Sequence, residues 1–331
     1  MTEERIRRLR AVMAVTMQWN FRVWGFGEAI ALRGLLRAGD QLADPEAFGF
    51  VHGILRSWLG RGVARSNEDH VGAGRELVDC FRRTGDARFL EAARRLATLN
   101  ACFPAGSSGA RYHRGDTPGW RWQIWVDCMD VDGPFLAALA RETGETGYFD
   151  QAVEELLGYA RALQTESGLL MHGFERDCGR NGALWARGNG WALMGLVDTL
   201  AMLPRAHPAW PELHRRTLAL ADALARTQHA SGLWHTVIDE PSTYLESTLA
   251  AMAAYALREG FAHGVLDEAA YGEMERRARA AMHAQVDPDG ALMLVSDATP
   301  VGALATYATR PFGVFPWGQG PLLLALCQEF A

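Results

Sequence analysis

Three aspartates lie close together in the stretch WQIWVDCMDVDGPFLAAL, at Asp127, Asp130 and Asp132. A carboxyl group in such a stretch can act as a general acid and base, or it can cap the helix that the following apolar residues predict. Capping is the role we expect for Asp130 or Asp132. Calcium is disfavoured, because the D-x-D-x-D-G pattern of a calcium loop has Cys128 in its first position and Leu139 where the closing glutamate belongs.

Asp127 is the candidate acid and base, because Trp125 and Val126 precede it. Apolar neighbours remove water from a carboxyl group and favour the protonated form that a proton donor needs. A second acid, Asp69, stands in SNEDHVGAGREL just before an apolar helical pattern. It is predicted either to cap that helix or to be a second active-site carboxylate.

The stretch LWARGNGWALMG places Trp185, Arg187 and Trp191 around a Gly-Asn-Gly turn where a helix begins. Gly188 and Gly190 let the backbone turn tightly. Aromatic faces and a guanidinium fork suit a sugar that carries a carboxylate, because the rings stack on the sugar and the fork binds the acid. The alternative is a helix N-terminus whose tryptophans belong to the core.

Three histidines stand in loop-like sequence. His113 and Arg114 lie in RYHRGD, His172 in MHGFERD and His235 in GLWHTV. Each also has an ordinary interpretation: a solvated loop for the first two residues and a hydrogen-bonded structural histidine for His172. His235 is partly architectural if GLWHTV is a repeat of GLLMHG.

The chain lacks the motifs of several other chemistries. It contains no G-x-S-x-G, no Walker loop, no H-E-x-x-H and no strand-borne G-x-G-x-x-G. Its five cysteines are scattered without a CxxC pair, and no compact metal-ligand spacing stands out. We therefore expect reduced thiols, no cofactor and no metal.

Composition excludes several kinds of partner. The 331 residues carry a formal net charge of −6 and no basic run, which argues against nucleic acid and against a membrane surface. The start MTEERIRRLR has no apolar signal core, and no uncharged stretch reaches transmembrane length. No low-complexity linker divides the chain. We expect a cytoplasmic protein in which residues 1–331 form a single domain.

The elements that must position these residues read as helices. Stretches such as YFDQAVEELLGYARALQ and HRRTLALADALARTQ have apolar residues at helical spacing. Gln164, Gln228 and Gln285 each end a helical pattern before a polar turn with glycine, and they stand 64 and 57 residues apart. A unit of about 59 residues fits two helices with their connections, and the chain holds between five and six units. This predicts an all-α fold, an (α/α)6 barrel with its chemistry in the loops at one mouth; an open solenoid is the competitor.

These motifs, in this order, resemble glycoside hydrolase family 105, the unsaturated rhamnogalacturonyl hydrolases. The likeness covers almost the whole chain, from WGFGEA through WVDCMDVDGPFLA, HGFE, WARGNGWAL and GLWHTVIDEPSTYLEST to WGQGPLLLA. It implies an (α/α)6 barrel that removes the 4,5-unsaturated galacturonic acid left by pectin lyases at the non-reducing end of rhamnogalacturonan fragments. The implied partner is an oligosaccharide that ends in an unsaturated uronic acid.

The resemblance also implies residue roles. Asp127 would protonate C4 of the double bond and help water add at C5, and Asp69 would be a second acid that shares a proton with it. One well-placed acid suffices for such a hydration, unlike the spaced carboxylate pair of ordinary glycosidases. The family's sugar contacts fall on His113, Arg114, His172 and Arg187, and its aromatic walls on Trp24, Trp125, Trp185 and Trp191.

The chain departs from the family pattern at three positions. Lysine is frequent in the family at Arg114, and hydrophobic residues are frequent at Asp130 and Asp132. Extra acids that pointed into the site would disfavour a polyanionic substrate, so the exact substrate is open.

Three other functions remain open from the sequence. An unsaturated glucuronyl hydrolase acting on other polysaccharide fragments would use the same chemistry. A sugar 2-epimerase-like isomerase on the same fold would need a facing histidine pair, such as His172 and His235. A non-catalytic glycan-binding toroid would keep the tryptophans and tolerate loss of Asp127. The sequence is compatible with a monomer or a homodimer.

Overall fold

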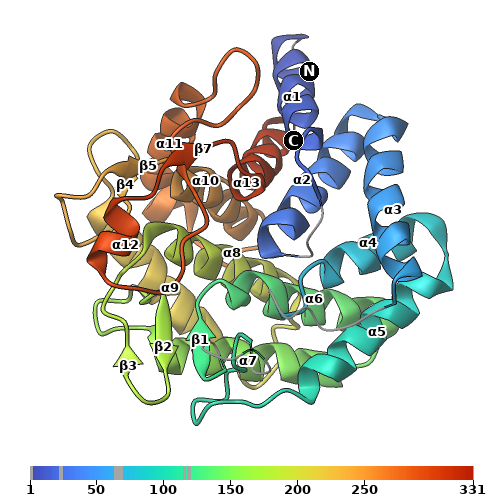
Figure 1. Ribbon diagram of the computed structural model, residues 1–331, viewed down its shortest axis with the longest axis horizontal. Coiled ribbons are helices and arrows are strands. Elements are labelled where there is room, and N and C mark those ends of the chain that lie inside the picture. Colours follow the sequence, from blue (N-terminus) through green and yellow to red (C-terminus); the bar gives the residue numbers. More distant parts are fainter. Residues whose placement is uncertain (1–2, 22–24, 63–69, 115–116, 118–120, 331) are drawn as a thin grey trace.

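The computed structural model describes residues 3–21, 25–62, 70–114, 117 and 121–330. Within these residues, six inner helices form a ring: α2 (Phe26–Leu42), α4 (Gly74–Thr84), α6 (Cys128–Thr143), α8 (Ala186–Met202), α10 (Thr248–Ala262) and α13 (Pro316–Cys327). Six outer helices cover it: α1 (Glu3–Met17), α3 (Pro45–Gly60), α5 (Ala87–Ala101), α7 (Gly147–Leu163), α9 (Trp210–Thr227) and α11 (Glu268–Ala284). Inner and outer helices alternate along the chain (Figure 1).

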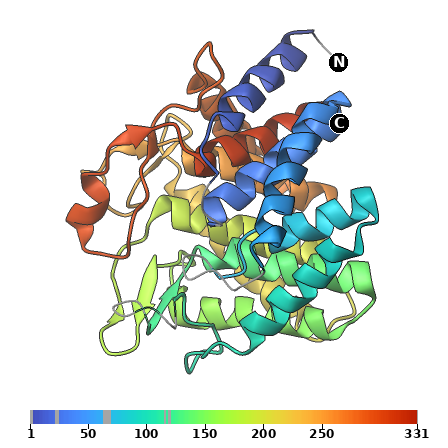
Figure 2. The same cartoon turned by 45° about the vertical axis from the view of Figure 1, so that its right-hand side comes forward.

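The ring closes between the two ends of the chain. The last long helix, α13, packs against both α1 and α2, as Figure 2 shows in blue and red. The expected (α/α)6 barrel is therefore confirmed, and the open solenoid is wrong.

Burial distinguishes the two sets of helices. The inner helix α8 is buried at every position from Ala186 to Leu200, because it contacts α6, α9 and α10. The outer helix α9 buries one stripe, which consists of Leu213, Thr217, Leu220, Ala221, Ala223 and Leu224. This is the pattern of an amphipathic helix on a core. Among the described helices, none has the length and apolar character needed to cross a membrane.

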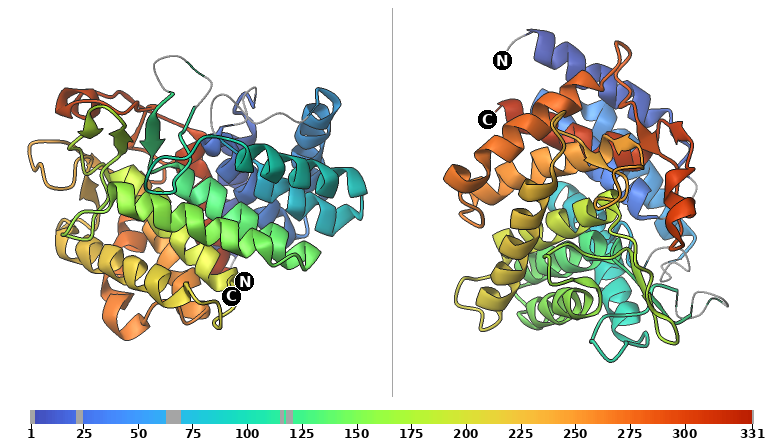
Figure 3. Two further views of the ribbon diagram at one scale, coloured as in Figure 1. Left: turned by 90° about the horizontal axis from the view of Figure 1, so that it is seen from below. Right: turned by 90° about the vertical axis from the view of Figure 1, so that its left-hand side faces the viewer.

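The connections differ strongly between the two ends of the barrel. Four outer helices lead into the next inner helix through long loops, which are 102–127, 164–185, 228–247 and 285–315. These loops contain the short strands β1 (Gln123–Trp125), β2 (Gly173–Glu175), β3 (Gly179–Arg180), β4 (Trp234–His235), β5 (Leu245–Glu246), β6 (Val295–Ser296) and β7 (Phe312–Gly313). The return connections are short, for example 43–44 and 85–86. In the left view of Figure 3 the strands lie along one edge of the helical body, which is the mouth at which the inner helices begin.

The repeated glutamines have a structural role. Gln164 follows α7 and donates from Nε2 to the Gly168 carbonyl at 2.9 Å, and Gln228 makes the same bond to Gly232 at 3.0 Å. Gly168 has φ +97°, and a Cβ there would lie 2.1 Å from the carbonyl oxygen of Ala219. Only glycine fits this turn, which explains the glycine of the repeated motif.

A buried carboxylate joins helices across the ring. Asp198 on α8 accepts hydrogen bonds from Arg33 of α2 (3.0 Å), Arg75 of α4 (2.5 Å) and the hydroxyl of Tyr255 on α10 (2.9 Å). Arg33 Nη2 also lies 3.6 Å from Asp130 of α6. Burial opposes the charge on Asp198, but the two arginines outweigh it and hold its pKa below the ordinary value.

We expect Asp198→Asn to lower the free energy of unfolding by about 3–5 kcal/mol, because it leaves two arginines without their shared counter-charge. Urea denaturation measures this loss. Glu212→Gln is the matched control, since Glu212 pairs with Arg215 and Arg216 at the exposed surface and such pairs contribute little. Equal stability of the two variants would contradict the role given to Asp198.

Two acids of the same core make stability depend on pH. Burial raises the pKa of Glu76 from its ordinary 4.5 to about 7 and that of Asp130 from 3.8 to about 6. The folded chain therefore binds these protons more tightly than the unfolded chain. Stability from these groups is present at acidic pH and is lost as the pH rises through about 6–7.

We compare the free energy of unfolding of the wild type with that of Glu76→Gln. The difference, wild type minus variant, should fall by about 1–3 kcal/mol between pH 5 and pH 8. Urea denaturation of both proteins at several pH values gives this difference. A difference that stays constant, or that grows with pH, would show that Glu76 is already ionised in the folded state.

Candidate active site

The pairing of β1 with β2 brings Asp127 and His172 together. Trp125 stands opposite Gly173, and the Val126 N–H donates to the His172 carbonyl at 2.9 Å. Asp127 comes next and immediately precedes α6. As a result, His172 Nε2 lies 3.2 Å from Asp127 Oδ2.

Asp127 is buried but keeps its oxygens unused. Asp127 is 1% exposed, and it occupies the N-cap position of α6 without a capping hydrogen bond from its side chain. Neither carboxylate oxygen accepts a hydrogen bond from any residue in the described ranges, and the contact with His172 Nε2 is not aligned as one. A buried carboxyl group without such bonds is costly, so it calls for a functional explanation. It can exchange a proton with a bound ligand.

His172 is fixed on its other side by a residue that the sequence did not single out. Its Nδ1 lies 2.7 Å from the hydroxyl of Tyr307, which belongs to the short helix α12 (Leu304–Ala308). The ring of His172 also lies 4.3 Å from that of Trp185 and 5.2 Å from that of Trp125. Tyr307 stands 135 residues after His172 in a segment without a motif, so no local signal could have revealed it.

His113 lies on the far side of Trp125. The two rings are stacked at 4.4 Å, and His113 Nδ1 lies 3.4 Å from Cys128 Sγ. Potential ligand atoms of His70, His113 and Cys128 all lie within 4.8 Å of one another, a convergence of the kind that can hold zinc. The sequence showed no metal-ligand spacing here. Both histidines already have protein contacts, His113 with Cys128 and His70 with Asp132.

Asp132 belongs to a buried cluster rather than to a helix cap. Its Oδ2 lies 2.9 Å from His70 Nδ1 and accepts the Tyr159 hydroxyl at 2.6 Å. Burial would raise the pKa of Asp132, but these two partners hold it below the ordinary value. The expected capping role of Asp130 or Asp132 is wrong, because α6 begins at Cys128 and both acids lie inside the helix. Each has a protein partner instead of standing as an extra free acid in the site.

Arg187 is 1% exposed and already saturated with protein partners. Its Nη1 donates to Glu246 at 2.6 Å and to the carbonyl and hydroxyl of Ser296 at 2.8 and 2.9 Å. Its Nη2 donates to the Asp297 carbonyl at 2.9 Å and to the Thr299 hydroxyl at 3.2 Å. The sequence suggested an open fork for a uronate. In the structure the guanidinium of Arg187 instead joins β5 to the loop after β6. A contact between Arg187 and a uronate stays a prediction.

Two of the three described tryptophans expected to form walls lie beside Asp127 and His172. Trp125 packs on His172, and Trp185 lies between His172 and the guanidinium of Arg187, which is 4.4 Å from its ring. Trp191 is fully buried and packs edge-on against a phenylalanine of α2, in agreement with the core interpretation of that residue.

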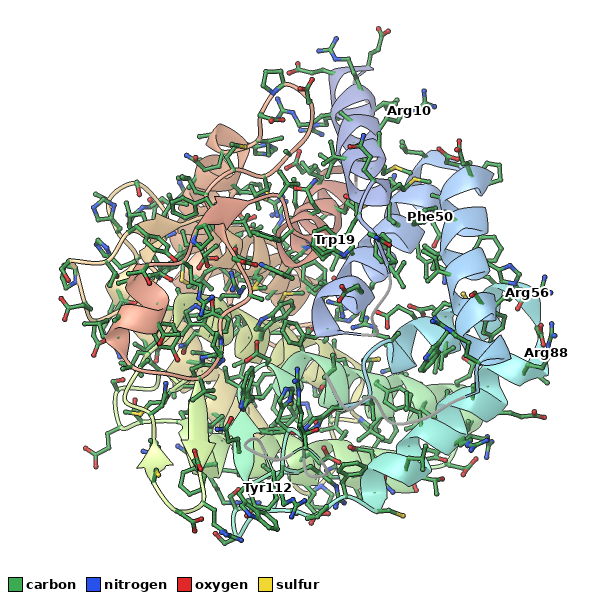
Figure 4. The ribbon with its side chains drawn as sticks, in the orientation of Figure 1. Arg10, Trp19, Phe50, Arg56, Arg88 and Tyr112 are labelled. Carbon is green, nitrogen blue, oxygen red and sulfur yellow. The ribbon has the colours of Figure 1, made fainter. Side chains whose placement is uncertain are left out.

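Aromatic contacts continue away from the site in both directions. Tyr112, labelled in Figure 4, packs edge-on against Trp122 at 5.3 Å beside β1. On the other side, Trp317 lies 5.6 Å from the Arg187 guanidinium and contacts Trp19, also labelled in Figure 4, at 6.3 Å.

Arg114, Asp69, Trp24 and His235 are the remaining residues that the sequence singled out. Arg114 follows His113 in a turn and is half-buried. Asp69 and Trp24 lie outside the described residues, so their roles stay predictions. His235 contacts the Thr243 carbonyl and the ring of His229, whereas His172 contacts Tyr307 and Asp127.

Comparison with known proteins gives matches over almost the whole chain. The model of Glycosyl Hydrolase Family 88 matches residues 1–330. The unsaturated rhamnogalacturonyl hydrolase YesR of Bacillus subtilis (strain 168) is 27% identical over 322 residues, which cover 95% of this chain and 91% of YesR.

Solved structures share the fold. A possible member of the GH105 family from Klebsiella pneumoniae subsp. pneumoniae MGH 78578 superimposes with a TM-score of 0.89 at 23% identity, covering 100% of this chain and 94% of that one. The unsaturated glucuronyl hydrolase of Bacillus sp. GL1, responsible for the degradation of glycosaminoglycan, superimposes with a TM-score of 0.75 at 18% identity, covering 99% and 97%.

We expect Arg187→Met to lower the free energy of unfolding by about 3–5 kcal/mol, because it leaves Glu246 buried without its counter-charge. The double variant Arg187→Met/Glu246→Gln should recover part of this loss. Urea denaturation measures both, with Arg215→Met at an exposed pair as the control that changes little. Normal stability of Arg187→Met combined with a large rise in KM would instead favour an open uronate fork.

Proposed function

The chain belongs to glycosyl hydrolase family 88, and from that premise we propose that it removes a 4,5-unsaturated uronic acid from the non-reducing end of rhamnogalacturonan-type oligosaccharides. It is a glycoside hydrolase that acts on oligosaccharides. The observation that carries the proposal is Asp127, a buried carboxyl group with both oxygens available and His172 facing it.

The reaction is hydration of a vinyl ether. Protonated Asp127 gives its proton to C4, and positive charge develops at C5 and the ring oxygen. Water adds at C5 while the Asp127 carboxylate accepts the water proton, which restores the acid. The hemiketal then opens to a ketone by cleavage of the C5–O bond, and the hemiacetal left at C1 expels the sugar alcohol. One water is consumed, and general acid–base catalysis by one group serves both proton transfers.

Other residues would bind and orient the sugar. We assign His113, Arg114, Trp125 and Trp185 to the unsaturated ring, because Trp125 and Trp185 both contact the ring of His172 and His113 stacks on Trp125. Asp69 is proposed as the second acid on the family resemblance alone. Arg187 would act by holding the Trp185 ring and the loop after β6 in place.

Preference for a rhamnogalacturonyl substrate rests on YesR, the relative matched over 95% of this chain. A glucuronyl substrate would keep the same chemistry and is distinguished by the assay below. The epimerase alternative needs His172 and His235 to face each other across one site. It loses support, because the two histidines contact no common residue in the described part of the chain. A cytoplasmic location and a monomeric or dimeric state stay predictions.

We expect Asp127→Asn to lower turnover by about 10²–10⁴-fold while substrate binding is kept, since an amide cannot give or take the proton. The measurement is loss of the ultraviolet absorbance of the C4=C5 bond in lyase-digested rhamnogalacturonan, with digested hyaluronan as the comparison. Asp150→Asn, an exposed site on α7 that contacts His207, is the control and should keep wild-type turnover.

The two substrates separate the possible results. A faster loss of absorbance with the rhamnogalacturonan digest supports the proposal. A faster loss of absorbance with digested hyaluronan would indicate a glucuronyl substrate instead. Near-normal turnover by Asp127→Asn would refute the mechanism.

A further inference from the structure

The side-chain amide of Asn181 has a fixed orientation. Its Oδ1 accepts the Gly173 N–H at 3.2 Å, and its Nδ2 donates to the Gly302 carbonyl at 3.1 Å. A backbone donor and a backbone acceptor cannot exchange roles, so the amide cannot be turned around without losing both bonds. Its second Nδ2 hydrogen therefore points to the hydroxyl of Tyr307, 2.8 Å away.

The direction of the next bond follows from the capacity of the phenol oxygen. Tyr307 Oη accepts from Asn181 Nδ2 and, at 3.4 Å, from the Gly302 N–H. A hydroxyl oxygen has two acceptor positions and one proton to donate. Both acceptor positions are filled, so the Tyr307 proton goes to its remaining neighbour, His172 Nδ1, at 2.7 Å.

We propose that Tyr307 is a positioning residue that holds His172 as the neutral tautomer with its proton on Nε2, the ring nitrogen on the side of Asp127. A neutral imidazole that accepts at Nδ1 must carry its proton on Nε2. That nitrogen lies 3.2 Å from Asp127 Oδ2. Hydrogen bonds made by one ring nitrogen commonly set the protonation of the other.

The tautomer matters for the chemistry of Asp127, so this inference rests on the proposed function. An imidazolium beside Asp127 would hold it as a carboxylate and make it a poor proton donor. A neutral imidazole beside Oδ2 adds no charge there, and both carboxyl oxygens of Asp127 stay available to carry the proton. A second proton on Nδ1 is opposed, because the Tyr307 oxygen has no acceptor position left for it.

The surroundings of Tyr307 keep the phenol in place. Its side chain is fully buried among Ala183, Trp185 and Val237, and the Tyr244 hydroxyl donates to its backbone carbonyl at 3.0 Å. Burial raises the pKa of Tyr307, which keeps the phenol protonated and able to donate. The segment that carries Tyr307 is also the one that Arg187 anchors at Asp297.

The direct test is nitrogen-15 NMR of the ten histidines, with the His172 signal assigned by its absence in His172→Gln. Long-range proton–nitrogen couplings distinguish a proton on Nε2 from one on Nδ1. We expect the wild type to show His172 as the Nε2–H form across neutral pH, and Tyr307→Phe to show a mixture of forms. A proton on Nδ1 in the wild type, or an unchanged tautomer in Tyr307→Phe, would overturn the proposal.

Kinetics provide the second readout. We expect Tyr307→Phe to lower kcat by about tenfold with little change in KM, because proton transfer rather than sugar binding is affected. The loss should be larger at pH 5.5 than at pH 7.5, since the unprotected Nδ1 takes up a proton as the pH falls. An equal loss at all pH values would indicate a merely structural effect and would contradict the proposal.

Two control variants separate the phenol proton from general loosening. Tyr271→Phe removes a phenol that donates to Asp222 between outer helices and should leave both readouts unchanged. Tyr244→Phe releases the Tyr307 backbone without removing its hydroxyl, and it should keep the wild-type tautomer. If Tyr244→Phe reproduced the whole effect of Tyr307→Phe, the proposal would be wrong.

The NMR result does not depend on turnover. If the protein shows the expected tautomers but consumes no unsaturated uronate, the proposed function fails and the positioning role of Tyr307 stands. If turnover is as proposed but the tautomers are not, the positioning role alone fails.

Discussion

The barrel depends on a charged contact through its centre. Asp198 on α8 binds Arg33 on α2, which is the helix opposite in the order of the ring, and also binds Arg75 and Tyr255 on two further inner helices. These bonds form only if the four helices keep one axial register, because each donor has a single acceptor to reach. Helix α6 joins the same cluster through Asp130 and is thereby fixed along the axis. Asp127 lies one turn earlier on that helix, so the charged core also sets the position of the candidate acid.

Stability and chemistry are placed at different parts of the molecule. The helices bury the apolar surface, and the long loops at one mouth bring together residues from distant parts of the chain. Trp125 and His113 come from loop 102–127, His172 from loop 164–185 and Tyr307 from loop 285–315. A small three-stranded antiparallel sheet, β1-β2-β3, and the two-stranded pairs β4-β5 and β6-β7 hold these loops in register.

Buried carboxylates in this protein differ in how fully they are bonded. Asp198, Asp132 and Glu246 each accept at least two hydrogen bonds from side chains of arginine, tyrosine or another donor. Asp127 is buried to the same degree, yet neither of its oxygens accepts one from a described residue. Asp132 and Glu246 each keep one oxygen without a hydrogen bond, but among these four acids only Asp127 has neither oxygen bonded to a described residue. This contrast singles out Asp127 from the other aspartates of WVDCMDVDG more sharply than its sequence neighbours do.

The sequence by itself predicted the helical fold and its repeat, and it singled out Asp127 as the candidate acid. Apolar spacing along a helix and a polar turn with glycine after it are local patterns, so YFDQAVEELLGYARALQ and the Gln-to-Gly turns could be interpreted without coordinates. Only the tertiary structure decided the partners of the polar groups. Arg187 could bind a uronate or Glu246, Asp132 could cap a helix or bind His70, and Tyr307 carried no signal at all. Hydrogen bonds between residues 59, 62 or 135 positions apart depend on how loops meet in space, and residue type and spacing do not encode that meeting.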